Sequence, residues 1–555
     1  MTFAPQFIRP GLLALTAVGT AVWTLGRRRA VPGLMRVVVV AMAVYALAQI
    51  GIALALFVNH APAPFNLEAM ESTVLEHVRR LMSGRVLYAD PTPQFGALAY
   101  NPLYYFVSIP FVWVFGSNLL ALRLSAIAAT LAAGVMVFVI VRRHSGSRWW
   151  ALIAVGLFAA AYRVMDCYLD TAHADGWMLF ATLLGCDLID RQGEGRRDMA
   201  GSVILVAAFW FKQHAALFTL GAVAYLIRRE GWRRAWPALA VVAVLGLGLY
   251  CIAPAWLGPR FHYFTWQVPR RWMSLDLGAL VRLAGVLGVA YPALAALSLG
   301  GMVAAVRSRR LHIWYALVPV ALATGLLGVM DGGSLDNVFI PLGVWLIVTG
   351  TIALKEFVDR FAAAERWGVH VAVLGISWTL LAYNPGALIV APSAARSCRE
   401  LVTFVHSLHG PVYAPMFGPL PAGNPFQPTL HAVALEDMIR APGFDERDHP
   451  LARRLLEPVL HPAGTAYLLV DAPIDQDPLL GFLARAYVLE TDLGERFADL
   501  AELPRRIEIG GPRYLYRTHS ARESGRGDER PITRDRLDPS GGAPDPNPET
   551  AREPR

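Results

Sequence analysis

Ionisable side chains that can do proton-transfer or phosphate chemistry recur at one set of ends of the apolar segments of this chain. A carboxylate can take a proton from a reacting hydroxyl, and a cation can stabilise a phosphate whose negative charge is growing. These side chains fall in four connecting segments: Glu68 and Glu71; Asp166, Asp170, His173 and Asp175; Lys212, Gln213 and His214; and Asp331, Asp336 and Asn337. Because these four segments all lie at the same ends of the apolar runs, we predict that their side chains form one polar site.

Arginines mark the opposite ends of the same segments. Turns rich in Arg and Lys stay on the cytoplasmic side of a membrane. The four segments that carry carboxylates, histidines and Lys212 are therefore expected on the extracytoplasmic face. The arginine-rich turns are 27–29, 142–148, 191–197, 228–234 and 307–310.

The composition is that of a polytopic membrane protein. Of 555 residues, 55% are hydrophobic and only 17% are charged, which is too apolar for a set of soluble domains. The net charge of +8 does not indicate nucleic acid, because the arginines lie beside membrane spans, where they set orientation and meet anionic lipids. The four cysteines show neither metal-ligand spacing nor a disulfide framework.

Apolar runs predict about eleven full spans of ~20 residues, together with short or re-entrant helices. Residues 102–116 are too short to cross, and a half-inserted helix there keeps Arg142 on the inner side. Residues 277–306 are expected to return as one span. The runs 199–211 and 215–227 are short as well, so Lys212 between them is predicted to be a recessed charge that faces a cavity or a partner.

An amphipathic helix on the outer membrane surface is expected after the second span. Asn66 is the predicted N-cap and Gly84 the predicted end of this helix. Glu68 and Glu71 are three residues apart and would share its face opposite the apolar stripe.

Shifts in composition divide the chain into four parts. After residue 390 the apolar spans stop, and short helical and strand patterns, including a buried strand over 466–470, predict a small α/β domain on the extracytoplasmic side. The last residues are Arg, Asp, Pro and Gly with almost no large apolar side chain, so disorder is expected there. The predicted parts are an N-terminal anchor helix and basic turn (1–34), the transmembrane catalytic domain (35–390), the α/β domain (391–517) and the tail (518–555).

Several stretches of the membrane part resemble the GT-C glycosyltransferases. The first outer loop of that family is similar to Glu68, the run Leu81-Met-Ser-Gly-Arg-Val-Leu-Tyr88, and the run Tyr100-Asn-Pro-Leu-Tyr-Tyr105, followed by Gly116 and Arg123. Lys212-Gln213 and the loop 333–337 are similar to later pieces. The resemblance covers about residues 35–390 and is nearest to bacterial enzymes similar to protein O-mannosyltransferases and aminoarabinose transferases. Phe65 and Asn66 stand where the family often has an aspartate before Glu68.

The resemblance implies a multi-pass enzyme of the bacterial plasma membrane. Its extracytoplasmic site would transfer a sugar from a polyprenyl-phosphate donor to a hydroxyl or amine of an envelope glycan, lipid or protein. Direct attack opposite the phosphate would invert the anomeric centre without a covalent intermediate. Membrane lipids are expected partners, and nucleic acid is not.

Side-chain chemistry assigns candidate roles in such a reaction. The candidates for acid–base catalysis are Glu68, Glu71 and Asp170. The candidates for binding the donor phosphate are Lys212, His262, Arg270 and Arg271. The candidates for other substrate contacts are Tyr100, Tyr104, His173, Gln213 and Asn337.

Other roles remain open for the same residues. Asp170, His173 and Asp175 could cap helices, or could bind Mg²⁺ or Mn²⁺, and no cofactor is otherwise expected. Lys212 could extend to the membrane interface. The alternative function is a transporter or lipid-sugar flippase without transferase activity. Such a protein needs a polar path to both faces and often has symmetric halves, and the sequence shows neither.

Overall fold

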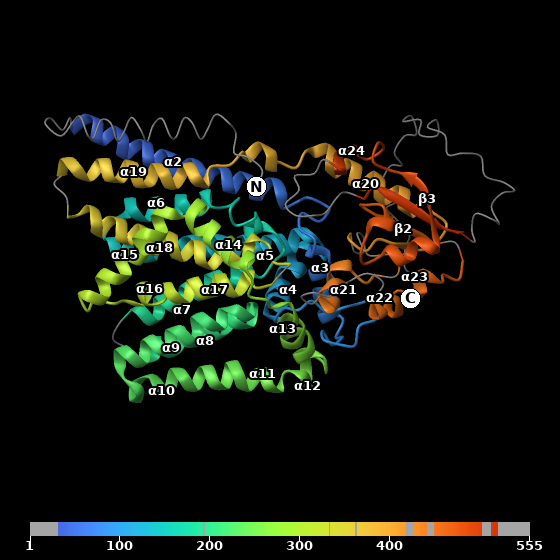
Figure 1. Cartoon of the computed structure of the whole chain (residues 1–555), viewed down its shortest axis with the longest axis horizontal. Helices are drawn as coiled ribbons and strands as arrows, with labels where there is room; N and C mark the ends of the chain where they lie inside the picture. The colour runs from blue at the N-terminus through green and yellow to red at the C-terminus, as the bar shows by residue number, and fades with distance from the viewer. Residues whose placement is uncertain are drawn as a thin grey trace, which may run out of the picture.

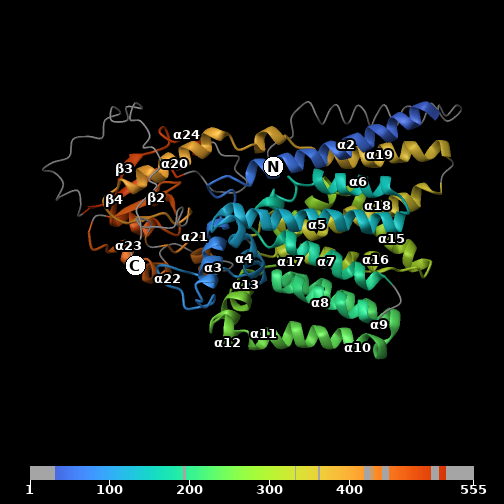
Figure 2. The same cartoon turned by 180° about the vertical axis from the view of Figure 1, so that it is seen from behind.

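The computed structural model describes residues 32–191, 195–331, 333–360, 363–417, 427, 429–440, 449–464, 466–501 and 512–519. The predicted anchor over 1–34 and the predicted tail over 518–555 lie almost entirely outside the described residues. Helices of the membrane part lie side by side as a bundle, and the C-terminal elements form a second unit at one end of it (Figures 1 and 2).

Helices of very different length build the bundle and its outer loops. The helices are α2 (Pro32–His60), α3 (Glu71–Met82), α4 (Leu103–Phe115), α5 (Leu119–Ser145), α6 (Arg148–Ala160), α7 (Asp175–Asp190), α8 (Gly195–Phe211), α9 (Ala216–Glu230), α10 (Trp232–Val241), α11 (Leu249–Ile252), α12 (Pro254–Leu257), α13 (Val268–Trp272), α14 (Leu277–Gly285), α15 (Pro292–Arg307), α16 (Ile313–Ala316), α17 (Val318–Val329), α18 (Ile340–Val358) and α19 (Ala363–Leu381). A π-helical stretch, η4 (Val242–Gly248), joins α10 to α11, and another, η6 (Val286–Ala290), follows α14.

Within the described residues, five helices are long and apolar enough to cross a membrane. A sixth span is counted if α14 and α15 are taken together. The bundle is therefore a multi-pass membrane structure, but the predicted number of about eleven spans is not confirmed. Residues 277–306, predicted to return as one span, bend by 96° between residues 290 and 292, so they count as one span only in this broken form.

Several predicted spans are short because they end at a layer of polar residues. α7 begins at Asp175, α8 ends immediately before Lys212, and α17 ends two residues before Asp331. At ~1.5 Å per residue, the 16 residues of α7 reach only ~24 Å, less than the ~30 Å of a bilayer core. The polar layer therefore begins where these short helices end.

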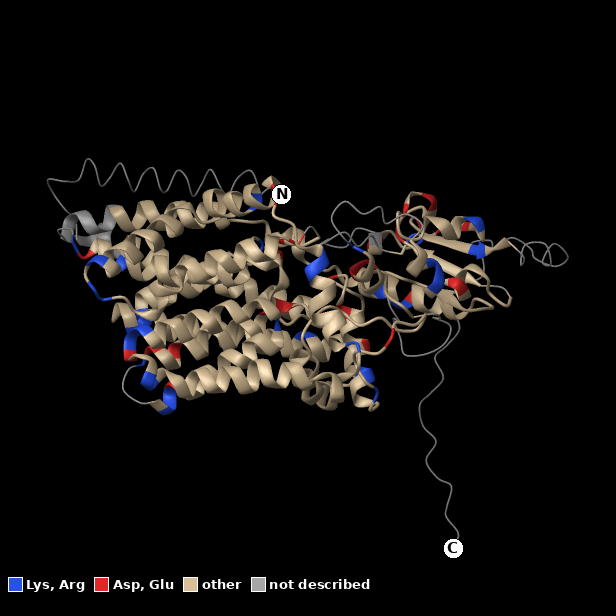
Figure 3. Cartoon of the chain, turned by 60° about the horizontal axis from the view of Figure 1, so that its bottom comes forward, with Lys and Arg blue, Asp and Glu red and all other residues tan. Residues whose placement is uncertain are grey.

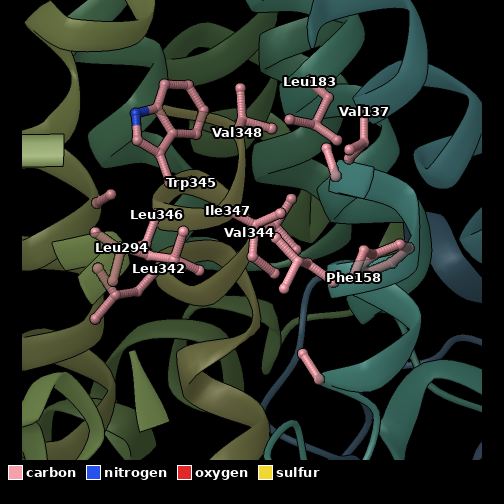
Figure 4. Packing of buried hydrophobic residues seen from close by; sticks show 14 of the residues in the cluster. Val137, Phe158, Leu183, Leu294, Leu342, Val344, Trp345, Leu346, Ile347 and Val348 are labelled. Carbon is pink, nitrogen blue, oxygen red and sulfur yellow. The ribbon is translucent and has the colours of Figure 1, made fainter. Parts of the chain in front are cut away.

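The core of the bundle is organised around α18. Residues 340–354 of this helix are all buried, so it is surrounded by protein rather than by lipid. Figure 4 shows Val344, Trp345 and Ile347 of α18 packed among side chains of its neighbours, with Val137 from α5 and Phe158 from α6. A helix that is apolar on all sides is expected in such a central position.

Arginines gather at the end of the bundle away from the C-terminal unit (Figure 3). There Arg143 of α5 pairs with Asp187 and Asp190 of α7, and Arg229 of α9 donates to the main-chain oxygen of Ile189. We call this the basic end of the bundle. The opposite end carries the polar layer, in agreement with the separation predicted from the sequence.

The outer amphipathic helix begins later than predicted. α3 starts at Glu71, and the side chain of Asn66 donates to Ser72 Oγ (2.9 Å) without capping the helix. The predicted start at Asn66 is therefore wrong, and Glu68 lies in the turn before α3 rather than on a helix face shared with Glu71. The helix ends close to Gly84 as predicted, where a φ of +72° suits glycine.

The C-terminal unit contains a four-stranded mixed sheet. Its strands are ordered β1 (Val412–Tyr413), β2 (Tyr467–Val470), β4 (Tyr514–Thr518) and β3 (Tyr487–Asp492), with β1 and β2 parallel and the other pairs antiparallel. The buried strand predicted over 466–470 is thus β2. The helices of this unit are α20 (Pro392–His406), α21 (Ala432–Ile439), α22 (Pro450–Leu455), α23 (Glu457–Leu460) and α24 (Ala498–Ala501). The domain boundaries themselves remain predictions.

α21 fixes the C-terminal unit against the outer loops of the bundle. A Cβ added at Gly96 would lie 2.9 Å from Leu430 Cδ1 and 3.3 Å from Ala434 Cβ, so glycine permits the close approach. Leu430 N donates to Pro93 O (3.0 Å), and Trp272 Nε1 donates to Asp437 O (2.9 Å). These contacts place residues of α21 directly above the polar layer.

The separation of the two ends predicts their membrane orientation. The substitutions Ser334→Cys and Ser308→Cys are made singly in a chain whose four native cysteines are replaced by serine, and each variant is treated with an impermeant maleimide. The cysteine at position 334 should be labelled in intact cells, and the cysteine at position 308 only after the membrane is opened, because the arginine-bearing end stays cytoplasmic. Equal labelling of both positions in intact cells would contradict the orientation.

Candidate functional site

A cavity of about 930 Å³ lies between α21 and the end of the bundle opposite the basic end. Its wall combines the turn before α3, the junction of α8 with α9, the loop after α17 and residues of the C-terminal unit. Of the predicted site residues, Glu68, Tyr100, Lys212, Gln213, Arg270 and Asn337 line the cavity. The structure thus brings together six residues that lie up to 269 positions apart in the sequence.

Glu68 is a buried carboxyl that borders the cavity. One oxygen accepts a hydrogen bond from Met70 N (2.9 Å), and the other accepts one from the Tyr168 hydroxyl (3.3 Å). Burial, followed by repulsion from Glu71, raises the pKa of Glu68 to about 8. A carboxyl in such surroundings can exchange a proton near neutral pH, which is what a general base requires.

Glu71 has the opposite environment and does not line the cavity. Both of its oxygens accept from Arg123, at 2.8 Å from Nε and 2.5 Å from Nη2, and the pair is fully buried. Ala172 N (2.9 Å) and Leu67 N (2.7 Å) donate to the same carboxylate. Burial alone would raise its pKa, but Arg123 and these amides hold the pKa of Glu71 below its usual range. A carboxylate so stabilised in its charged form is a poor proton acceptor.

Arg123 uses all its N–H groups at this point. Besides the two bonds to Glu71, it donates to three main-chain oxygens in the connection from α2 to α3. The guanidinium therefore fixes the path of the chain just before Glu68. The three acceptors are His60 O (3.0 Å), Ala63 O (2.6 Å) and Phe65 O (2.7 Å).

Asp170 belongs to a separate buried group. Its carboxylate contacts His60 Nδ1 (2.7 Å) and accepts from the Tyr162 hydroxyl (2.7 Å), while His60 Nε2 lies 2.6 Å from Leu388 O. This group joins the end of α2, the turn after α6 and the segment after α19. Asp170 does not line the cavity.

The turn that precedes Asp170 is strained. Asp166 and Cys167 have φ values of +56° and +61°, which cost free energy for residues other than glycine. The turn directs Tyr168 into the cavity wall, where its hydroxyl bonds Glu68 and its ring meets that of His173 at 5.2 Å. Strain next to the candidate base is typical of functional sites.

Lys212 lines the cavity and also forms an ion pair with Asp175. The residue is extended between α8 and η3 (Gln213–Ala215), and its Nζ lies 2.8 Å from Asp175 Oδ1. The other oxygen of Asp175 bonds His173 and lies 3.5 Å from Asn337 Nδ2. One carboxylate therefore balances the buried ammonium, as a charge at this depth requires.

His173 does not line the cavity but contacts Asp175 and Tyr168 behind its wall. Burial lowers the pKa of its ring below the usual range despite the neighbouring Asp175, so the ring is neutral at pH 7 and donates through Nδ1. Asp170, His173 and Asp175 do not form a common ligand cluster of the kind found elsewhere among the described residues. The use of Mg²⁺ or Mn²⁺ stays a prediction.

The remaining candidates differ in position. Gln213 donates to Ala99 O (2.7 Å), which fixes the segment that carries Tyr100. Tyr104 is buried and donates to Leu122 O (3.0 Å), so it supports α4 rather than the cavity wall.

The cationic candidates also differ in whether they line the cavity. Arg270 is exposed and borders the cavity. Arg271 lies over the ring of Tyr263, and His262 Nε2 lies 2.9 Å from Tyr250 O. Neither Arg271 nor His262 lines the cavity.

The C-terminal unit supplies the part of the wall that sequence reasoning missed. Asp437 and Arg440 of the α21 region border the cavity, Arg440 lies 3.5 Å from Asp331 Oδ1, and its guanidinium covers the ring of Trp272.

The sequence carried a signal for His60, a histidine at the end of an apolar run. It carried none for Asp437, because long-range packing alone brings that residue to the cavity.

No protein-family model and no curated protein matches the sequence. Among solved structures, the chain resembles ArnT from Cupriavidus metallidurans in the apo state, with a TM-score of 0.53, 13% sequence identity, and coverage of 86% of this chain and 98% of the other. The structure of the same protein bound to undecaprenyl phosphate gives a TM-score of 0.53 and 13% identity, over 85% and 97% of the two chains. The chain therefore has an ArnT-like fold, as the resemblance noted in the sequence implies.

The Glu71–Arg123 pair predicts a large stability effect. Arg123→Ala should lower the free energy of unfolding by about 3 to 5 kcal/mol, because it leaves the Glu71 carboxylate charged and buried without the arginine that balances its charge. Thermal unfolding of the detergent-purified protein measures the change. Arg148→Ala, at an exposed position on the basic end, is the control, and equal melting temperatures for the two variants would contradict the role of the pair.

Proposed function

We propose that this chain is a membrane glycosyltransferase that transfers a sugar from a polyprenyl-phosphate donor to a hydroxyl or amine on the extracytoplasmic face. The observation that carries the proposal is that a proton-accepting carboxyl, Glu68, and a recessed cation, Lys212, line the same cavity. The likeness to ArnT supports it through the fold, and one of the ArnT structures binds undecaprenyl phosphate.

Glu68 is the proposed general base. The acceptor oxygen attacks the anomeric carbon from the side opposite the phosphate, and its proton passes to the Glu68 carboxylate. The bond between the anomeric carbon and the phosphate oxygen breaks, and its electron pair leaves with the polyprenyl phosphate. The product has inverted configuration, and no covalent enzyme intermediate is formed.

Lys212 is the proposed contact for the phosphate. An ammonium has three N–H donors, and Asp175 takes one of them. The other two have no hydrogen-bond partner within the described part of the chain and can donate to phosphate oxygens, whose charge grows as the bond breaks. Such contacts are stronger in a desolvated cavity than at the surface. Arg270 on the rim adds a second positive charge.

The acceptor is proposed to meet the C-terminal side of the cavity. Met416, Asp437 and Arg440 border the space opposite the helix junction that carries Lys212. An envelope glycan, lipid or protein at the outer membrane face would approach from this side. Tyr100 and Asn337 complete the wall on the bundle side.

Glu68→Gln tests the proposed base. Purified protein is incubated with polyprenyl-phosphate sugars that carry a radiolabelled sugar, and loss of label from the lipid is followed. The variant should lose about 10²- to 10⁴-fold in rate with donor affinity unchanged. Near wild-type turnover would exclude Glu68, and a wild-type protein that moves labelled lipid across vesicles without consuming it would favour a flippase.

The control for this variant is Glu76→Gln on α3, the helix that follows Glu68, because Glu76 is half-buried and outside the cavity. The pH profile gives a second check. With the pKa of Glu68 raised to about 8, only about one tenth of the free enzyme carries the ionised base at pH 7. The wild-type kcat/KM should therefore rise about tenfold per pH unit below pH 8 and then level off, whereas a flat profile from pH 6 to 9 would contradict the assignment.

Lys212→Met tests the phosphate contact. Methionine keeps most of the stem and removes the charge, so donor affinity and the single-turnover rate should both fall, the rate more because leaving-group charge grows in the transition state. The double variant Lys212→Met with Asp175→Asn removes both buried charges and controls for the stability of the fold. Wild-type affinity and rate in Lys212→Met would remove Lys212 from the site.

A further inference from the structure

Three ligand-type side chains from separate helices meet at the basic end, far along the bundle from the cavity. His144 lies in the last turn of α5, Asp190 ends α7, and His312 directly precedes α16. One potential ligand atom from each lies within 4.8 Å of the other two. His144 Nε2 is 2.9 Å from Asp190 Oδ2, and the centroids of the two imidazole rings are 4.6 Å apart.

The burial of the His312 imidazole nitrogens is not explained by protein contacts alone. Neither of its ring nitrogens has a hydrogen-bond partner among the described residues, although both atoms are buried. Its ring stacks on Tyr315 at 4.4 Å, which fixes its orientation. An imidazole without a partner leaves both a donor and a lone pair unsatisfied, which costs free energy.

We propose that His144, Asp190 and His312 form a zinc site that ties α5, α7 and the start of α16 together. Two imidazole nitrogens and one carboxylate oxygen are a donor set that suits Zn²⁺, whereas Mg²⁺ and Ca²⁺ prefer oxygen alone. Tetrahedral zinc with bonds of ~2.0 to 2.1 Å holds its ligand atoms ~3.3 Å apart. His144 Nε2 and Asp190 Oδ2 are already 2.9 Å apart, and His312 lies within 4.8 Å of both, so its nitrogen needs to approach them by at most ~1.5 Å. Water takes the fourth position.

Charge balance at the basic end is compatible with a bound dication. Arg143 shares Asp190 with His144, but it also donates to Asp187, which pairs with Arg191 as well. When the metal takes Asp190, Arg143 keeps Asp187 as its acceptor. Neither arginine is then left without a carboxylate partner.

Each of the two helices held by this site also carries one partner of a buried ion pair. α5 bears Arg123 near one end and His144 near the other, and α7 begins at Asp175 and ends at Asp190. A metal that joins their inner ends would restrict sliding of α5 against α7. The site does not depend on the proposed transfer reaction.

Metal binding to the full chain tests the proposal. Protein without a polyhistidine tag is stripped with a chelator and titrated with Zn²⁺ against a chromophoric competitor. The wild type should bind one equivalent, and His312→Gln should lose at least about tenfold in affinity, since even outer-shell changes cost about 10- to 100-fold. His461→Gln, at an exposed histidine of the C-terminal unit, should bind like the wild type.

Cobalt(II) provides a check that needs no variant. Bound to the wild type, it should show the visible absorption bands of a four-coordinate ion, and saturating Zn²⁺ should abolish these bands and raise the melting temperature. Failure of the wild type to bind stoichiometric metal would overturn the proposal. Retention of full zinc affinity in both His312→Gln and Asp190→Asn would overturn it as well, because the metal would then lie elsewhere.

Discussion

The buried ion pair between Glu71 and Arg123 is the interaction on which the rest of the site depends. Burying two charges is costly, and the cost is offset only when every donor and acceptor is satisfied. Here each carboxylate oxygen accepts two hydrogen bonds and the guanidinium donates five. The partners come from the end of α2, the turn before α3, α5 and the segment after Asp170. One side-chain pair thus holds four segments in register, and the turn that presents Glu68 to the cavity is among them.

Two glutamates three residues apart consequently have opposite properties. Glu71 is kept charged by Arg123 and by main-chain amides, whereas Glu68 has one hydroxyl and one amide as partners and no cation. Environments that push the pKa values of neighbouring acids in opposite directions separate their roles. Glu71 positions the turn, and Glu68 keeps a carboxyl that can gain or lose a proton. The same logic pairs Lys212 with Asp175, since an ammonium at that depth requires a nearby anion.

The sequence predicted the features that follow from local composition. The arginine bias, the junction at Lys212, the strand over 466–470 and the gathering of Glu68 and Asn337 with Lys212 at one end of the bundle follow from periodicity and charge. Tyr100 was predicted from the resemblance to GT-C glycosyltransferases. The predicted start of α3 was wrong because Asn66 donates to Ser72 instead of capping the helix. Asn66 lies in the loop whose path is fixed by Arg123. The pairing of Asp170 with His60 and the contribution of Asp437 depend on contacts between distant segments. No pattern within a short window encodes such contacts.

Because residues of the C-terminal unit close the cavity, the cavity can be completed only late in the synthesis of the chain. Residues that close the cavity, Asp437 and Arg440, are made after the last apolar helix, α19, and the sheet beside them is complete only when β4 pairs with β2. At ~5 to 20 residues per second, the interval between the end of α19 and the end of β4 is on the order of ten seconds. During that interval the membrane helices have been synthesised while the polar layer is still open to water. A nascent chain arrested in this stretch would carry Glu68 and Lys212 without the enclosure that gives them their properties.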